Sequence, residues 1–229
     1  MPEAKRKPGT QTVKADDHIV ATRAKILAAA LPNVAFDGWT SKVMREAADA
    51  AGISHGEMRL AFPGGITDLV DCFLADGDRR MEEALAKLDL GALKIRERIT
   101  LAVRTRIEVD AAHREAVRRA VTLLALPISG ATGPRTLYRT VDAIWRAAGD
   151  RSTDFNFYTK RAILAGVYST VTLTWFGDET EDHAATWAFL DRRIADVMQI
   201  EKAKASVQKI GALLPDPVAL LGRLRYRRS

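Results

Sequence analysis

The sequence predicts an all-α protein with a small N-terminal helix-turn-helix unit and a larger helical body. Apolar residues recur at the spacing of amphipathic helices along most of the 229-residue chain, and the alternating runs typical of strands are absent from the sequence. The segment from Thr40 to Phe62 has the spacing of two helices joined by a tight turn. A chain of this length can bury a core of ordinary size.

The N-terminal region is expected to start with a disordered arm. Residues 1–15 are basic, contain prolines and lack apolar periodicity. From Asp16, apolar residues at helical spacing predict a first helix, which Pro32 should stop because proline lacks the N–H that a helix interior needs. Residues 16–65 then form the helix-turn-helix domain.

The turn of the motif is marked by residues with clear local roles. Thr40 is a good N-cap for a second helix, which should end at Gly52, where glycine permits a tight turn. Ile53 is expected to fill the angle between the two helices. Ser54 and Glu57 have the spacing of a capping box at the start of a short third helix.

The body is assigned to residues 66–200. The segment from Ala162 to Gly177 has no charged residue but is shorter than the roughly 20 apolar residues of a membrane span, so it is expected to be a buried helix. It should form an antiparallel hairpin with the helix that follows the acidic turn at 178–182. Earlier helices are predicted from Thr67 to Leu88, Ile95 to Val109, Ala111 to Leu126, and Pro134 to Ala148, the last with Pro134 at its first position.

The helix-turn-helix residues resemble those of the TetR regulator family. The similarity runs from Gly38 through Ala47-Ala48 and Ala51-Gly52-Ile53-Ser54-His55-Gly56 to Phe62 and Leu69. It implies a TetR-like homodimer in which the later helices form a ligand-binding body.

Three further stretches resemble a narrower group, the coenzyme Q biosynthesis protein nine family. They are Ala29 to Pro32 with Phe36 to Thr40, Phe62 to Gly65 with Asp68 to Val70, and Thr186 to Ile194. The resemblance covers about Ile26 to Met198. It implies an accessory protein of ubiquinone biosynthesis that binds an isoprenoid lipid or quinone intermediate, meets a membrane through a C-terminal amphipathic helix, and presents its ligand to a pathway hydroxylase.

The alternative function is a ligand-controlled transcriptional repressor. Operator binding needs hydrogen-bond donors on the reading helix, but residues 55–61 offer one permanent cation, Arg59, and one acid, Glu57. His55 and the basic arm keep DNA binding open as an alternative. Nucleic acid is nevertheless not the expected partner.

A polyprenyl chain needs a long apolar cavity between helices, which periodicity alone cannot distinguish from plain core. Hydroxyls at Ser169, Thr170, Thr172 and Thr174 either bond back to carbonyls one turn earlier or line a ligand site or dimer seam. The candidate lipid-binding residues are Val103, Ile107, Leu123, Leu137, Val141, Ile144, Trp145, Leu164, Val167, Tyr168 and Val171.

A homodimer is expected to form through the last two body helices, which contain Val171 and Trp187. Trp187, Leu190 and Ile194 share one face of the final helix and are assigned to the dimer or partner surface.

The tail, residues 201–229, combines leucines with seven Lys or Arg residues against two acids, in a chain of net charge +6. This pattern favours an anionic membrane surface, and the alternative is an amphipathic helix folded back on the body. The candidate membrane residues are Leu213, Leu214, Leu220, Leu221, Arg223, Leu224, Arg225, Arg227 and Arg228.

Residues for catalysis are sparse. Four histidines are scattered, Cys72 lies within an apolar pattern, and neither a phosphate loop nor a nucleophile elbow occurs in the sequence. We therefore expect no enzyme activity, no metal and no cofactor. Without a secretory or transit pattern, the expected location is the cytoplasm of a bacterium, at the inner face of the membrane.

Overall fold

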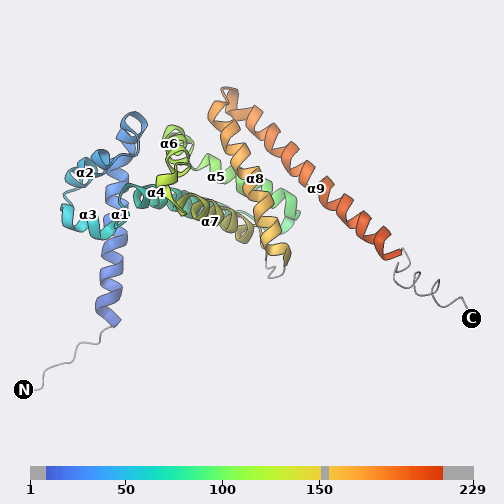
Figure 1. The fold of residues 1–229 in the computed structure, drawn as a ribbon, viewed down its shortest axis with the longest axis horizontal. Helices are drawn as coiled ribbons and strands as arrows, with labels where there is room; N and C mark the ends of the chain where they lie inside the picture. Colours follow the sequence, from blue (N-terminus) through green and yellow to red (C-terminus); the bar gives the residue numbers. More distant parts are fainter. Residues whose placement is uncertain (1–8, 151–154, 214–229) are drawn as a thin grey trace, which may run out of the picture.

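The computed structural model describes residues 9–150 and 155–213. Within these residues the protein is helical and has no β-strand, which confirms the all-α fold class (Figure 1). The α-helices are α1 (Gly9–Asp37), α2 (Ser41–Ala50), α3 (His55–Ala61), α4 (Ile66–Leu85), α5 (Ile95–Glu108), α6 (Arg114–Leu124), α7 (Thr132–Ala147), α8 (Phe155–Gly177) and α9 (Ala184–Leu213).

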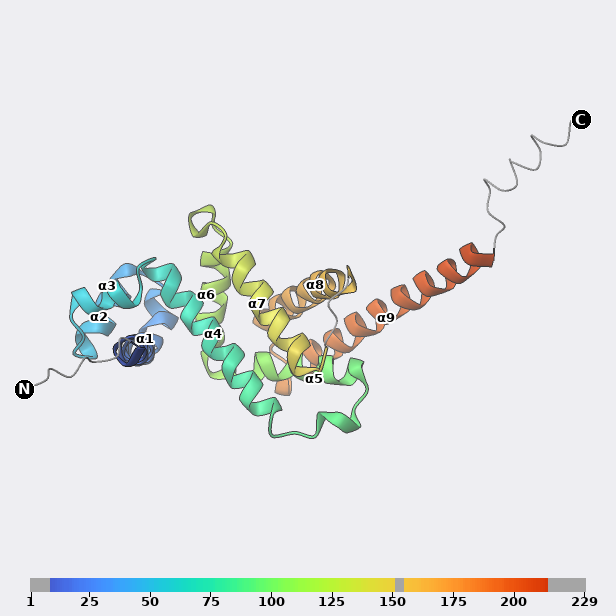
Figure 2. The same cartoon turned by 90° about the horizontal axis from the view of Figure 1, so that it is seen from below.

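Helices α1, α2 and α3 form a unit at one end of the molecule (Figures 1 and 2). The predicted caps of this unit are confirmed: Thr40 accepts a hydrogen bond from the Val43 N–H, and Ser54 and Glu57 form the capping box of α3. Gly52 has a φ of +69°, the left-handed conformation that its tight turn requires. The sequence pattern therefore located both helices of the motif correctly.

The first helix is longer than predicted at both ends. It begins at Gly9, inside the segment expected to be disordered, and it continues past Pro32 to Asp37. Pro32 itself is exposed, whereas Ala30 and Val34 on either side of it are fully buried. Burial of residues on both sides of Pro32 therefore outweighs the hydrogen bond that proline cannot make, so the predicted stop at Pro32 is wrong.

The N-terminal unit is fixed to the body through α6. The indole Nε1 of Trp39 donates a hydrogen bond to the Ala116 carbonyl at 2.9 Å, and the Trp39 ring packs 5.2 Å from the Phe73 ring of α4. Within the body, α4 packs against α5 and α7, and α7 packs against α8. The ends of three body helices differ from prediction: α4 stops at Leu85, α6 starts only at Arg114, and α7 starts at Thr132, before Pro134.

The last two helices form the predicted hairpin, and α9 extends beyond the body at the opposite end from α1 (Figure 2). Residues 162–177 of α8 were expected to be buried because they carry no charge. The helix is not buried on all sides. Gly166 and Thr170 are exposed on its outer face, and Leu173 is 60% exposed. The absence of charge from residues 162–177 of α8 therefore does not reflect complete burial within one chain.

Candidate ligand-binding cavities

The predicted lipid-binding residues lie around two cavities rather than one. Seven of the eleven are buried in the core, and five of these line neither cavity: Val103, Ile107, Val141, Ile144 and Val171. The other six are divided: Trp145, Leu164 and Val167 line one cavity, Leu137 and Tyr168 line the other, and Leu123 packs half-buried against the core.

The first cavity, called here the α9 cavity, lies between α5, the end of α7, α8 and α9 and has a volume of about 380 Å³. Its lining is mainly apolar, with the ring of Trp145 and the side chains of Ile99, Ile163, Leu164, Val167, Ile194 and Val197. Its charged lining residues are Arg96, Lys160 and Asp150, and Lys160 Nζ lies 3.2 Å from Asp150 Oδ1. The Lys160 ammonium also lies 5.5 Å from the Trp145 ring centroid. Lys160 and Asp150 therefore bind one another, and most of the lining is apolar surface that an apolar ligand could contact.

The second cavity, called here the α6 cavity, is enclosed by α4, α5, α6, α7 and α8 and also has a volume of about 380 Å³. Leu74, Val117, Val121, Leu124 and Leu137 provide most of its apolar lining. Hydroxyl groups from α7 and α8 also line it, together with the Arg106 guanidinium: these are Thr136, Thr140, Tyr168, Ser169 and Thr172.

A buried ionic cluster forms one side of the α6 cavity. Arg106 is 1% exposed, and its guanidinium donates to Asp78 Oδ1 at 2.8 Å and to Asp110 Oδ2 at 2.5 Å. Its third hydrogen bond reaches the Leu74 carbonyl at 3.1 Å. Burial by itself lowers the pKa of Arg106, but the neighbouring Tyr168, Asp110 and Asp78 raise this pKa by more, so the net shift is upward. Arg106 is therefore a cation whose charge is already balanced.

The cluster extends to the surface through two more arginines. Arg80 donates to Asp110 at 2.5 Å, and Arg139 donates to Asp78 at 3.1 Å. Gly77 allows this arrangement, because a Cβ at this position would lie 2.7 Å from the Arg106 guanidinium. Sequence reasoning missed this cluster, although Gly77 and Asp78 interrupt the apolar face of α4 and were the available signal.

The hydroxyl run of α8 shows both of the behaviours that the sequence left open. Thr170 donates to the Gly166 carbonyl at 2.8 Å, and Thr174 donates to the Thr170 carbonyl at 2.9 Å. Thr172 is 5% exposed and lines the α6 cavity. Thr172 therefore faces the α6 cavity, as does Ser169, whereas Thr170 and Thr174 bond back to the helix backbone.

The residues assigned to the dimer surface pack within the chain. Leu190 is 1% exposed and belongs to the core, and Ile194 lines the α9 cavity. The half-buried Trp187 donates from Nε1 to the Asp182 carbonyl at 2.8 Å, and the Arg104 guanidinium of α5 lies 4.7 Å from its ring centroid. This face of α9 therefore contacts its own protomer.

The start of α9 depends on one carboxylate that the sequence analysis did not single out. Asp178 accepts hydrogen bonds from the backbone and side chain of Thr180 at 2.9 and 2.6 Å, and from those of Thr186 at 2.7 and 2.6 Å. Hydrogen bonds from the side chains of Thr180 and Thr186 hold the pKa of Asp178 well below its ordinary value. Thr186, the first residue of the Thr186-to-Ile194 stretch, is fully buried and connects the start of α9 to Asp178.

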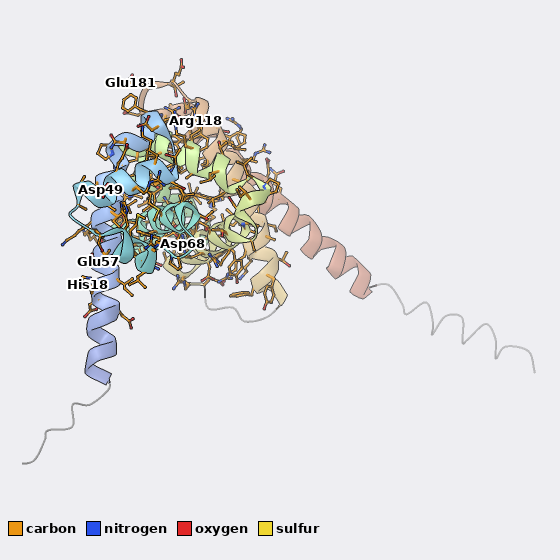
Figure 3. The ribbon with its side chains drawn as sticks, turned by 60° about the vertical axis from the view of Figure 1, so that its left-hand side comes forward. His18, Asp49, Glu57, Asp68, Arg118 and Glu181 are labelled. Carbon is orange, nitrogen blue, oxygen red and sulfur yellow. The ribbon has the colours of Figure 1, made fainter. Side chains whose placement is uncertain are left out.

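The outer side of the helix-turn-helix unit presents few free donors. His55 Nε2 lies 3.2 Å from Asp49 Oδ1, and His18 Nε2 lies 3.7 Å from Glu57 Oε1 (Figure 3). Glu57 is also engaged as the cap of α3. The reading helix also exposes Arg59 and an apolar residue, Leu60, which is 74% exposed.

Several further expectations concern sites that the described residues only partly cover. The membrane residues 214–229 lie outside the described part of the chain, and Leu213 is the last residue of α9. Among the residues that are described, no group of three or more His, Cys, Asp or Glu side chains is placed to hold a metal ion. One described helical stretch, Asp16–Asp37, has the length and apolar composition of a membrane span, but it belongs to α1, which packs against α2 and α3.

Comparison with known proteins relates the chain to ubiquinone biosynthesis proteins. Residues 130–201 match the COQ9 family model. "Ubiquinone biosynthesis protein COQ9, mitochondrial" of Rattus norvegicus is 34% identical over 197 residues, covering 83% of this chain and 63% of the relative. The human protein of the same name is 33% identical, covering 83% and 62%. The chain therefore spans less than two thirds of the length of these relatives.

A solved structure supports the fold. The TetR transcriptional regulator from Nitrosomonas europaea superposes with a TM-score of 0.60 at 23% sequence identity, covering 76% of this chain and 95% of the regulator. This similarity confirms the predicted TetR-like fold and, at that identity, shows the fold alone.

The relatives also correct the expected location. The rat and human relatives, and a Drosophila melanogaster relative that is 34% identical over 188 residues, are mitochondrial proteins of eukaryotes. The expectation of a cytoplasmic protein at the inner face of a bacterial membrane is therefore wrong. The match over α7 to α9 and these identities confirm the predicted resemblance of the chain to the COQ9 family.

Proposed function

We propose that the protein is an accessory factor of ubiquinone biosynthesis that binds an isoprenoid lipid or quinone intermediate and presents it to a pathway hydroxylase. The pathway is supported by the names of the relatives. The observation that carries the binding role is the α9 cavity, with its largely apolar lining of about 380 Å³. Cavities of this size class hold small ligands.

The chemistry of the α9 cavity suits a prenyl chain with a polar end. An isoprenoid gains by leaving water for an apolar surface, at about 25 cal/mol per Å² of buried apolar area. Its chain would lie against Ile163, Leu164 and Val167, and its head group would face Arg96 and the Lys160–Asp150 ion pair. The ion pair is adjacent to the Trp145 ring, which offers a flat surface to a ring-shaped head group.

An accessory role is favoured over a repressor by the surface of the N-terminal unit. The two histidines that could face a phosphate, His18 and His55, lie beside the carboxylates of Glu57 and Asp49. Exposed carboxylates repel the DNA backbone, and Leu60 gives the reading helix an apolar rather than a basic residue at its exposed end.

The proposal includes a homodimer. Its contact surface is the outer face of α8 rather than the face of α9 around Trp187. This face carries Gly166, Thr170 and Leu173, all exposed and uncharged. A Cβ at Gly166 would meet nothing within 4 Å in the same chain. An open, uncharged helix face of this kind suits packing against a second copy.

The proposal is tested by titrating purified protein with geranylgeraniol and measuring binding by calorimetry. Replacing Ile163 by tryptophan should fill the α9 cavity and weaken binding at least tenfold, because Ile163 is a half-buried lining residue. Leu126→Trp is the matched control, because Leu126 is 49% exposed and does not line the cavity.

Two results would count against this function. Binding that is unchanged by Ile163→Trp would move the lipid elsewhere. Specific binding of duplex DNA at physiological salt by lipid-free protein would support the repressor instead. Presentation is tested separately, by asking whether loaded protein increases the rate at which a hydroxylase modifies a prenylated phenol relative to the lipid alone.

A further inference from the structure

The connection between α6 and α7, residues 125–131, exposes apolar side chains at its tip. Ile128 is 84% exposed and Leu126 is 49% exposed, and Pro127 between them is also exposed. In Figure 2 this connection stands out from the body beyond α6 and α7. These three residues, called here the α6–α7 tip, line neither cavity, so the proposed function does not use them.

The α6–α7 tip belongs to a well-formed turn. The Ser129 N–H donates to the Leu126 carbonyl at 3.0 Å, and the Gly130 N–H donates to the Pro127 carbonyl at 3.0 Å. The Ser129 hydroxyl donates to the Leu123 carbonyl at 2.7 Å, which fixes the turn to the end of α6. Polar backbone that enters lipid must find its partners within the protein. The turn therefore presents its apolar side chains on a backbone that already has internal hydrogen bonds.

The sequence around the tip contains no acid. Residues 116–141 include no Asp or Glu and four arginines, which are Arg118, Arg119, Arg135 and Arg139. Three of the four pair with carboxylates elsewhere in the chain. Arg135, in the first turn of α7, is exposed and forms no ion pair with any described acid. The tip is therefore accompanied by a positive charge that the described residues do not neutralise.

The far end of α9 lies on the same side of the molecule as the tip. In Figure 2 the tip and the last turn of α9 both lie towards the upper side of the view, and the connection between α4 and α5 lies at the lower side. The chain continues after α9 into residues 214–229, which contain leucines and four arginines. A flat surface that met the tip would therefore also face the end of α9 from which this basic segment leaves the body.

A lipid surface fits the tip better than a protein partner does. A stable protein–protein contact usually buries about 800 Å² on each partner, with matching shapes. The tip offers three apolar residues on a convex turn and a single unpaired cation, Arg135. A bilayer needs no matching shape, and insertion of a few apolar side chains beside a cation suits its anionic interface.

We propose that the α6–α7 tip is a membrane-contact site, in which Leu126, Pro127 and Ile128 enter the interface of an anionic bilayer. Arg135 faces the lipid phosphates beside them. The apolar side chains gain by leaving water, and the arginine gains by approaching the anionic head groups. The site depends neither on the ligand of the α9 cavity nor on the candidate membrane residues of the tail, and it adds a second contact to any that the tail makes.

The contact is tested by sedimentation of the full chain with vesicles of equal parts phosphatidylcholine and phosphatidylglycerol. Ile128→Asp should lower the partition coefficient at least fivefold, because it places a negative charge at the inserted tip. Leu88→Asp is the matched control, since Leu88 is 51% exposed in the connection between α4 and α5, on the opposite side in Figure 2. It should change the partition coefficient less than twofold.

The contribution of charge is tested separately with Arg135→Gln. This variant should bind the mixed vesicles about three- to fivefold more weakly, the effect expected of one basic residue near an anionic surface. Its binding to vesicles of phosphatidylcholine alone should be unchanged. Equal weakening on both kinds of vesicle would show that Arg135 does not face anionic head groups, and the proposal would be wrong.

The position of the tip is measured directly, because the tail could hold the protein on vesicles by itself. The fluorophore NBD, attached to Ile128→Cys in a Cys72→Ala chain, should shift its emission to shorter wavelength on the mixed vesicles. Lipids with a spin label on the acyl chain should quench it. The same fluorophore on Leu88→Cys should show neither effect.

Three outcomes would overturn the proposal. The full chain does not bind vesicles, or it binds while the fluorophore at residue 128 stays in water, which leaves the tail as the contact. In the third, the emission changes with protein concentration rather than with vesicles, which assigns the tip to a second copy. Ile163→Trp should lose geranylgeraniol binding and keep vesicle binding, so failure of the proposed function is distinguished from failure of this site.

Discussion

The α9 cavity and the α6 cavity have the same volume of about 380 Å³ but different polar groups. In the α9 cavity, the paired side chains of Lys160 and Asp150 lie with Arg96 among mainly apolar lining residues. In the α6 cavity, an apolar lining is backed by the fully buried charge of Arg106. The comparison shows that a single helix, α8, can serve two unlike sites when its neighbours differ.

The difference arises from the helices that face α8 on each side. Helix α4 brings Asp78 and Gly77 against Arg106 of α5, and the absence of a Cβ at Gly77 makes room for the guanidinium. On the other side, α9 contributes Ile194 and Val197. A buried ion pair is retained at a desolvation cost, so the α6 cavity is expected to be the more sensitive of the two to loss of a partner.

The largest expected effect tests that sensitivity. Asp78→Asn removes one of the two carboxylates that neutralise Arg106 and leaves a buried cation with an incomplete set of partners. Breaking a buried ion pair in this way costs about 3–5 kcal/mol of unfolding free energy. Urea unfolding followed by circular dichroism measures the loss.

The control for this prediction lies on the same helix. Glu82 pairs with Arg146 at the surface, so Glu82→Gln should change the free energy of unfolding by less than about 1 kcal/mol. A loss of similar size in both variants would show that Arg106 is not held as a buried charge, and the contrast between the two cavities would disappear.

The second prediction concerns the outer face of α8. Of its residues Gly166, Thr170 and Leu173, only Leu173 lines a cavity, the α6 cavity. Gly166→Glu places a charge on this face without a clash inside the protomer, and glutamate is a better helix former than glycine. If two copies pack through α8, sedimentation should show at least tenfold weaker dimerisation. Ala28→Glu, on an exposed part of α1, is the control and should leave assembly unchanged. A Gly166→Glu protein that remains fully dimeric would place the interface elsewhere.

The elements of the fold were largely predictable because their signals are local. The caps Thr40 and Ser54 depend on neighbours within a few residues, and both are observed. The end of α1 was not predictable in this way, since continuation past Pro32 depends on burial of Val34 in the assembled core. Local rules therefore predicted the helices but not every boundary.

The candidate site was predicted less well than the fold, for a physical reason. Periodicity shows which face of a helix points inward, but whether the inward space is filled depends on several helices together. Val141 and Leu164 are both buried in the core, yet only Leu164 also lines a cavity. Thr172 illustrates the same limit, because only the assembled structure distinguishes it from Thr170.

The smallest expected effect concerns the turn that holds α9 against the body. Asp178 caps α9, which lines the α9 cavity but not the α6 cavity. Because the pKa of Asp178 is lower in the folded protein than in the unfolded chain, its contribution to stability is complete at neutral pH. That contribution is lost as the pH falls below about 4, the ordinary pKa of an aspartate, towards the folded value.

Asp178→Asn should therefore be less stable than the unmodified protein at pH 7, and the difference should shrink progressively in acid. Thermal unfolding at a series of pH values below 7 measures this convergence. At neutral pH the variant should bind geranylgeraniol a few-fold more weakly, because α9 forms one wall of the α9 cavity and is less firmly held. Unchanged geranylgeraniol binding in a destabilised variant would show that the start of α9 does not position this wall.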